Sequence, residues 1–85
     1  MKTIILTRHA RARMAQYGLP EAAVVAAVRH PLWTEPDPRP GVERRFGRPP
    51  ELDGRVLRVA CVEENDHIRV LSAFPDRDAR PPDGA

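Results

Sequence analysis

Cysteine is nearly absent from this chain of 85 residues: Cys61 stands alone, so no internal disulfide can form. A lone cysteine suits a reducing compartment, and we expect a cytoplasmic protein. Long apolar runs are also lacking, since none in the sequence approaches the roughly 18 residues of a membrane-spanning helix. The apolar stretch near the N-terminus is shorter than the roughly 7 to 15 residues of a secretory signal. The sequence therefore predicts neither a membrane span nor export.

Motifs for metals and nucleotide cofactors are missing too. The three histidines and Cys61 do not fall at ligand spacings such as CxxC or HxxxH. No glycine-rich phosphate loop and no HExxH motif occurs. We accordingly expect no metal and no cofactor. His30, next to a proline, and His67, after an acidic turn, are expected to be surface residues.

The charge is nearly balanced, with 14 basic and 12 acidic residues and a net charge of +2. This net charge is too small for a strong, nonspecific nucleic-acid binder. All the basic residues except Lys2 are arginines. Arginine forks suit phosphate recognition, but a GC-rich genome produces the same bias without any function. Composition alone leaves these two explanations open.

The N-terminal part predicts a short strand and two helices. Residues 3–6 are rich in β-branched side chains and are typical of a strand. Thr7 can cap a helix over residues 8–17, and Gly18 can end it. Pro20 and the acidic residue after it favour a second helix, which must end near His30 because a proline follows.

The C-terminal part predicts an antiparallel meander. Six of the ten prolines lie between residues 31 and 50, where only one short edge strand is expected. The three predicted strands are residues 42–46, 55–62 and 67–74. The predicted fold class is α+β, with two N-terminal helices packed on a three- to four-stranded antiparallel sheet. Residues 1–75 form the single domain, and residues 76–85 are expected to be a disordered tail.

Two residues on the first helix, His9 and Arg13, stand one turn apart at the edge of its apolar stripe. A histidine can move protons near neutral pH, and an arginine can stabilise the charge on a pentavalent phosphate. The pair therefore fits phosphodiester chemistry. The alternative is a surface histidine beside an arginine whose stem covers apolar surface.

Four residues on the predicted strands are further candidates. Arg44 and Arg45 point to opposite faces of an edge strand, where both can be simply solvated. Arg58 lies among apolar neighbours on the central strand, so it must be paired or line a cleft. Ser72 is expected on the same face as Ile68, Val70 and Phe74, either as a functional hydroxyl or as a small filler.

The motifs resemble a known family. Residues 7–14 (TRHARARM) and 17–19 (YGL) look like the "THA..RM..RGI" opening of the DUF4258 family. Arg45-Phe46, residues 54–59 (GRVLRV) and residues 70–74 (VLSAF) resemble its "G..LRVV…VVTAY" ending. The resemblance spans residues 3–75.

The DUF4258 family is largely bacterial and resembles the RelE/ParE-like, or barnase–EndoU–colicin–RelE, group of metal-independent ribonucleases, many of which are toxins. By position, the resemblance assigns His9, Arg13 and Arg58 to the family's histidine, helix arginine and strand arginine. Ser72 takes the place of its strand threonine. Tyr17 stands where an arginine is common, and Phe74 where a tyrosine is common. These departures remove a cation and a phenol from the implied site.

The expected function is a toxin-like, metal-independent endoribonuclease that acts on RNA phosphodiesters. The resemblance implies His9, Arg13, Arg58 and Ser72 as catalytic residues, with Tyr17, Arg44 and Arg45 contacting substrate. The alternative is a non-catalytic domain of the same fold that pairs with an antitoxin-like protein, and a third is a domain with only structural residues there. An open cleft where His9, Arg13 and Arg58 converge favours the enzyme. A filled cleft, with these three side chains salt-bridged to Glu43 or Glu51, favours the alternatives.

Overall fold

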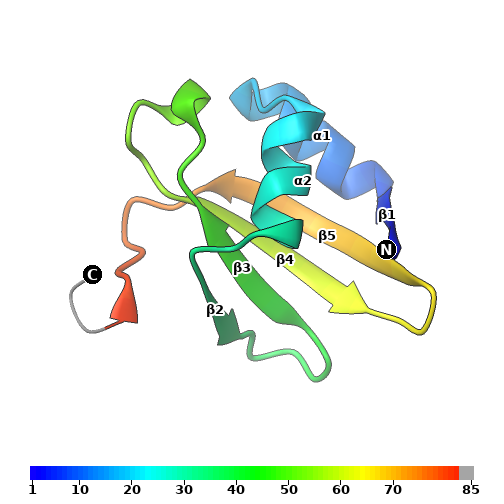
Figure 1. Ribbon diagram of the computed structural model, residues 1–85. Helices are drawn as coiled ribbons and strands as arrows, with labels where there is room; N and C mark the ends of the chain where they lie inside the picture. Colours follow the sequence, from blue (N-terminus) through cyan, green and yellow to red (C-terminus); the bar gives the residue numbers. More distant parts are fainter. Residues whose placement is uncertain (83–85) are drawn as a thin grey trace.

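The computed structural model describes residues 1–82 as two helices and a five-stranded sheet (Figure 1). The elements in chain order are β1 (Thr3–Leu6), α1 (Arg8–Tyr17), α2 (Glu21–Arg29), β2 (Trp33–Pro36), β3 (Glu43–Gly47), the 3-10 turn η1 (Pro50–Leu52), β4 (Leu57–Glu63) and β5 (His67–Pro75). The α+β class and the two N-terminal helices are therefore as predicted. No helix in the described part of the chain is long and apolar enough to cross a membrane.

The sheet differs from the prediction in its size and direction. Its strand order is β1-β5-β4-β3-β2, and β1 runs parallel to β5 while the other neighbours are antiparallel. The predicted antiparallel pairing holds for β2 to β5, whereas the predicted number of three to four strands and the all-antiparallel direction do not hold for the whole sheet. The direction of β1 is not set by a local turn, because both helices follow β1 in the sequence before the next strand begins. Strand β2 was missed because its four residues, WTEP, end in a proline and alternate poorly.

Both helices have the ends that their sequences predict. The Thr7 hydroxyl accepts a hydrogen bond from the Ala10 amide at 3.1 Å and so caps α1. Gly18 ends α1 in the left-handed region, at a φ of 64°. Pro20 precedes the first residue of α2, and His30 follows its last residue. The two helices are thereby fixed as a tight hairpin.

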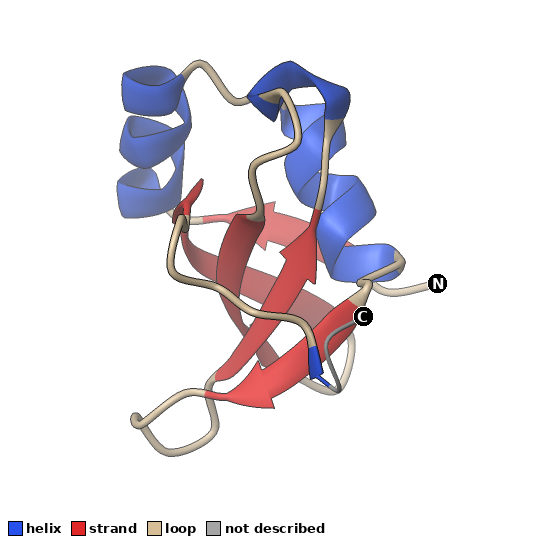
Figure 2. Cartoon of the chain, turned by 90° about the vertical axis from the view of Figure 1, so that its left-hand side faces the viewer, coloured by secondary structure: helices blue, strands red, loops and turns tan. Residues whose placement is uncertain are grey.

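The helices cover one face of the sheet (Figure 2). α1 packs on β5, and α2 packs on β3 and β4. The main core lies between these layers and includes Val24, Val28, Leu57, Val59 and Val70. Cys61 belongs to the same core and is fully buried, and this burial raises the pKa of its thiol. The opposite face is called the open face below.

A bulge in β5 changes which side chains reach the open face. Ala60 pairs with Ser72, but the next residue of β4, Cys61, pairs with Val70, so Leu71 is the extra residue. Val70 lies in the core with the helices, whereas Ser72 lies on the open face. The expectation that Ser72 shares a face with Val70 was therefore wrong, because the bulge inverts the alternation between them.

A second, smaller cluster on the open face holds Trp33, Phe46 and Val56, with the Trp33 and Phe46 rings stacked at 4.5 Å between centroids. Ala79 packs against this cluster. Part of the expected tail, residues 76–82, is therefore described in the structure and contacts the sheet. The stacked rings offer an apolar surface on which even the small Ala79 side chain packs. Residues 83–85, the end of the predicted disordered tail, lie outside the described residues.

Candidate functional site

A polar cleft on the open face brings together residues from four elements. It has a volume of about 380 Å³. Its lining residues are His9, Asp37, Pro38, Arg39, Arg44, Arg58, Ala60, Leu71, Ser72 and Phe74. We call it the open-face cleft. Four of the seven sequence-predicted site residues line it: His9, Arg44, Arg58 and Ser72.

His9 reaches the cleft from the first turn of α1, and its side chain is exposed. The first turn of this helix contains no acidic residue. The partial positive charge at the N-terminal end of α1 is therefore not neutralised within its own turn. An anion in the cleft would meet the His9 imidazole.

Arg58 is held in the cleft by an aromatic ring and a carboxylate. Its guanidinium lies over the Phe74 ring, 4.5 Å from the ring centroid. Its Nε lies 3.5 Å from Oδ2 of Asp76, which is longer than an ideal charge-assisted hydrogen bond. Phe74 stands where the family commonly has a tyrosine, and here it supplies a stacking surface instead of a hydroxyl. The sequence requirement that Arg58 be paired or line a cleft is met in both ways.

Arg44 shares a carboxylate with Arg39 at the rim of the cleft. Nε of Arg39 donates to Oδ1 of Asp37 at 2.9 Å, and Nε of Arg44 donates to Oδ2 at 3.0 Å. The Asp37 side chain is 7% exposed. The hydrogen bonds from Arg39, and then that from Arg44, hold the pKa of Asp37 well below its ordinary value. The lining residues thus include three arginines and one carboxylate, and two of the arginines, Arg39 and Arg44, contact that carboxylate.

Arg45 lies on the other side of β3 and serves the fold. Nη1 of Arg45 donates to the Val28 carbonyl at 2.9 Å, near the end of α2. Its Nε and Nη2 each donate at 2.7 Å, to the carboxylates of Glu43 and Glu63 respectively. The side chain is only 12% exposed. Arg45 therefore ties a helix end to two strands and does not line the cleft.

Arg13 and Tyr17 also lie away from the cleft lining. Nη1 of Arg13 donates to Oε1 of Gln16 at 2.7 Å on the surface of α1. Tyr17 is 41% exposed at the last position of α1. The helix therefore contributes His9 alone to the cleft.

Sequence reasoning missed Asp37 and Arg39, which lie in the loop between β2 and β3. The Arg39 amide donates to Oδ1 of Asp37 at 3.0 Å, which closes an Asx turn around Pro38. An aspartate two residues before an arginine, with a proline between them, was the available signal. The contact of this loop with the cleft depends on the sheet register, which no local pattern encodes.

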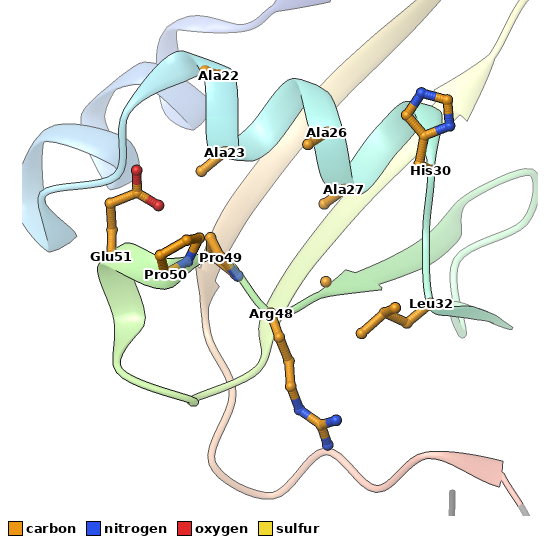
Figure 3. Close-up of a pocket in the computed structure, with 11 residues that line it drawn as sticks. Ala22, Ala23, Ala26, Ala27, His30, Leu32, Arg48, Pro49, Pro50 and Glu51 are labelled. Carbon is orange, nitrogen blue, oxygen red and sulfur yellow. The ribbon is translucent and has the colours of Figure 1, made fainter.

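A second hollow lies on the helix side of the molecule, between α2 and the segment from Gly47 to Glu51 (Figure 3). Its volume is about 430 Å³. Its floor is formed by the alanines of α2, namely Ala22, Ala23, Ala26 and Ala27. A Cβ on Gly47 would lie 3.2 Å from that of Ala27, so this glycine permits the close approach of strand and helix. We call this hollow the alanine groove; His30, Arg48 and Glu51 are its polar lining residues.

The family comparison agrees with the motifs. The model of the DUF4258 family, described as a domain of unknown function, matches residues 6–75. The chain belongs to the DUF4258 family. All four predicted residues that line the open-face cleft lie within the range of this DUF4258 domain, whereas Asp76 and Ala79 lie beyond it. No curated protein and no solved structure matches the chain.

Proposed function

We propose that this DUF4258 chain binds RNA at the open-face cleft and cleaves a phosphodiester there without a metal. The observation that carries the proposal is the convergence of His9, Arg44, Arg58 and Ser72 on one cleft from four separate elements. An imidazole can transfer a proton, and two arginines and a hydroxyl can stabilise phosphoryl charge, in the cleavage of a phosphodiester by the ribose 2′-hydroxyl. The family resemblance to RelE/ParE-like ribonucleases supports a toxin-like role in the bacterial cytoplasm.

In the proposed reaction, the 2′-hydroxyl oxygen attacks the adjacent phosphorus and the bond from phosphorus to the 5′-oxygen breaks. The products are a 2′,3′-cyclic phosphate and a 5′-hydroxyl. His9 takes the proton from the attacking hydroxyl or gives one to the leaving oxygen, and water exchanges the other. Arg44 and Arg58 stabilise the charge on the phosphoryl oxygens, and the Ser72 hydroxyl donates a hydrogen bond to one of them.

The proposal is tested with a short single-stranded RNA and two variants. His9→Ala should lower the cleavage rate by roughly 10²–10⁴-fold and leave RNA affinity nearly unchanged, because an exposed imidazole adds little to binding. Arg58→Gln should weaken RNA binding by about tenfold, the effect of losing one charged hydrogen bond.

The matched control is Arg48→Gln, which removes the same charge from the alanine groove. If RNA affinity falls equally in Arg48→Gln and Arg58→Gln, binding depends on net charge and not on the cleft. RNA binding that is equally strong in the wild type and in Arg58→Gln would refute the proposal.

A second candidate function is a non-catalytic domain that binds a partner protein. The alanine groove favours it, because its floor is apolar and 60% of the neighbouring Leu32 is exposed. The fitting partner is an antitoxin-like acidic segment whose apolar side chains enter the groove beside Arg48.

A further inference from the structure

The chain after β5 is anchored on the open face, beside the cleft. The Asp76 amide donates to the Val56 carbonyl at 2.8 Å, which extends the pairing of β4 and β5 by one contact. The Ala79 amide donates to the Asp76 carbonyl at 3.3 Å, and the Asp78 amide to the Asp76 carboxylate at 3.0 Å. This turn lays Ala79 on the Trp33 and Phe46 cluster. Residues 76–82 are called the strap below.

The strap brings carboxylates to the two arginines that the proposed function uses. Arg44 and Arg58 also line a neighbouring hollow of about 440 Å³, whose strap side is formed by Asp76, Asp78, Ala79 and Arg80. Asp76 contacts Arg58 directly, and its side chain is only 14% exposed. Arg58 is therefore shared between the cleft, where a phosphate would bind, and the strap, whereas Arg44 borders both hollows and pairs with Asp37.

We propose that the strap is an autoinhibitory element in which Asp76 competes with RNA phosphate for Arg58. This inference rests on the proposed function and adds its regulation. A carboxylate and a phosphate make the same kind of charge-assisted hydrogen bond to a guanidinium, so both cannot fully occupy Arg58. The Asp76 contact is long at 3.5 Å, and the strap is held by few groups, so a phosphate can displace it.

The apolar anchor of the strap and its blocking charge belong to different side chains. Ala79 holds the strap through apolar contact, and Asp76 supplies the competing charge. Docking can therefore be measured separately from RNA binding. Trp33 is the chain's one tryptophan and is 9% exposed, with Ala79 packed on its cluster. Quenching of its fluorescence by acrylamide reports whether the strap is in place.

The test uses the full chain, with Asp76→Asn as the main variant and a short single-stranded RNA as the probe. Asp76→Asn removes the competing charge, and RNA affinity should rise about twofold to fivefold, the range for a partly exposed ion pair. Glu51→Gln is the matched control, because it removes the same charge from the alanine groove, and its affinity should stay at the wild-type value. Ala79→Gln keeps the charge but displaces the strap, and it should raise both acrylamide quenching and RNA affinity.

The outcomes separate the inference from the proposed function. RNA binding that depends on Arg58 but is unchanged or weaker in Asp76→Asn and Ala79→Gln overturns the strap and leaves the proposed function standing. Unchanged quenching and affinity in Ala79→Gln likewise overturn it. RNA binding by Asp76→Asn but not by the wild type supports a complete block. No binding by any of these chains overturns the proposed function and the strap with it.

Discussion

Arg44 and Arg45 are adjacent in the sequence, and the pleat of β3 sends them to opposite faces. Arg44 lines the open-face cleft, whereas Arg45 is partly buried and hydrogen-bonds to the end of α2. Sequence reasoning stated that the two face apart but could not tell which one faces the cleft. That depends on the register between β3 and β4, which places Arg45 opposite the core residue Val59.

This contrast predicts two different phenotypes from the same substitution. Arg45→Gln should destabilise the fold by about 1 to 3 kcal/mol, because the Val28 carbonyl and two carboxylates lose a partly buried donor. Arg44→Gln should weaken RNA binding and change stability less. Urea unfolding and RNA titration of both variants provide the measurement. Equal stability losses in the two variants would contradict the assignment of roles.

At the scale of single elements, the helices were predictable and the loops were not. Thr7 begins α1 and Gly18 ends it through local hydrogen bonds and backbone conformation. Such local signals can be recognised from a short stretch of sequence. The bulge at Leu71 left no such signal, yet it decides that Ser72 joins the cleft. The loop between β2 and β3 likewise gave no local signal for the cleft, because the register of the sheet brings Asp37 and Arg39 to it.

The Asp37 contacts make this loop sensitive to pH. The pKa of Asp37 is lower in the folded chain than in the unfolded chain, so acidification protonates the unfolded state first and stability falls. The loss should begin near the ordinary aspartate pKa of about 4 and grow as the pH falls further. Asp37→Asn should be less stable at neutral pH and should show a flatter decline in acid. Urea midpoints over this range test the prediction, with Asp53→Asn as a control that should follow the wild-type curve.

At the scale of the whole molecule, apolar patterning predicted the α+β class and the core strands but not how the outer strands pair. Residues 55–62 and 67–74 are long and apolar enough to be recognised from the sequence as a central strand and its partner. The outer strands β1 and β2 have four residues each, and their pairing is fixed by the completed sheet rather than by their own sequences. The site followed the same rule. His9 and Arg58 could be selected as candidate site residues from the sequence, whereas their meeting with Arg44 in one cleft depends on the tertiary fold.

The end of the folded domain is also a property of the whole molecule. Residues 76–85 contain no large apolar side chain, which is why composition favoured disorder from residue 76. Composition does not include the Trp33 and Phe46 surface that Ala79 covers, or the carbonyl of Val56 that the Asp76 amide reaches. Deleting residues 76–85 should therefore lower the free energy of unfolding by about 1 to 2 kcal/mol, from one hydrogen bond and the lost apolar contact.

The same deletion should shift the emission of Trp33 to longer wavelength, because its cluster becomes open to water. Arg77→Gln is the control: this side chain is exposed in the middle of the strap, so both readings should stay at their wild-type values. A deletion that leaves the unfolding midpoint and the Trp33 emission unchanged would place the end of the domain at Pro75. A lower unfolding midpoint together with a shifted Trp33 emission would make residues 76–82 part of the folded domain. The strap can act on Arg58 only if it is part of that domain.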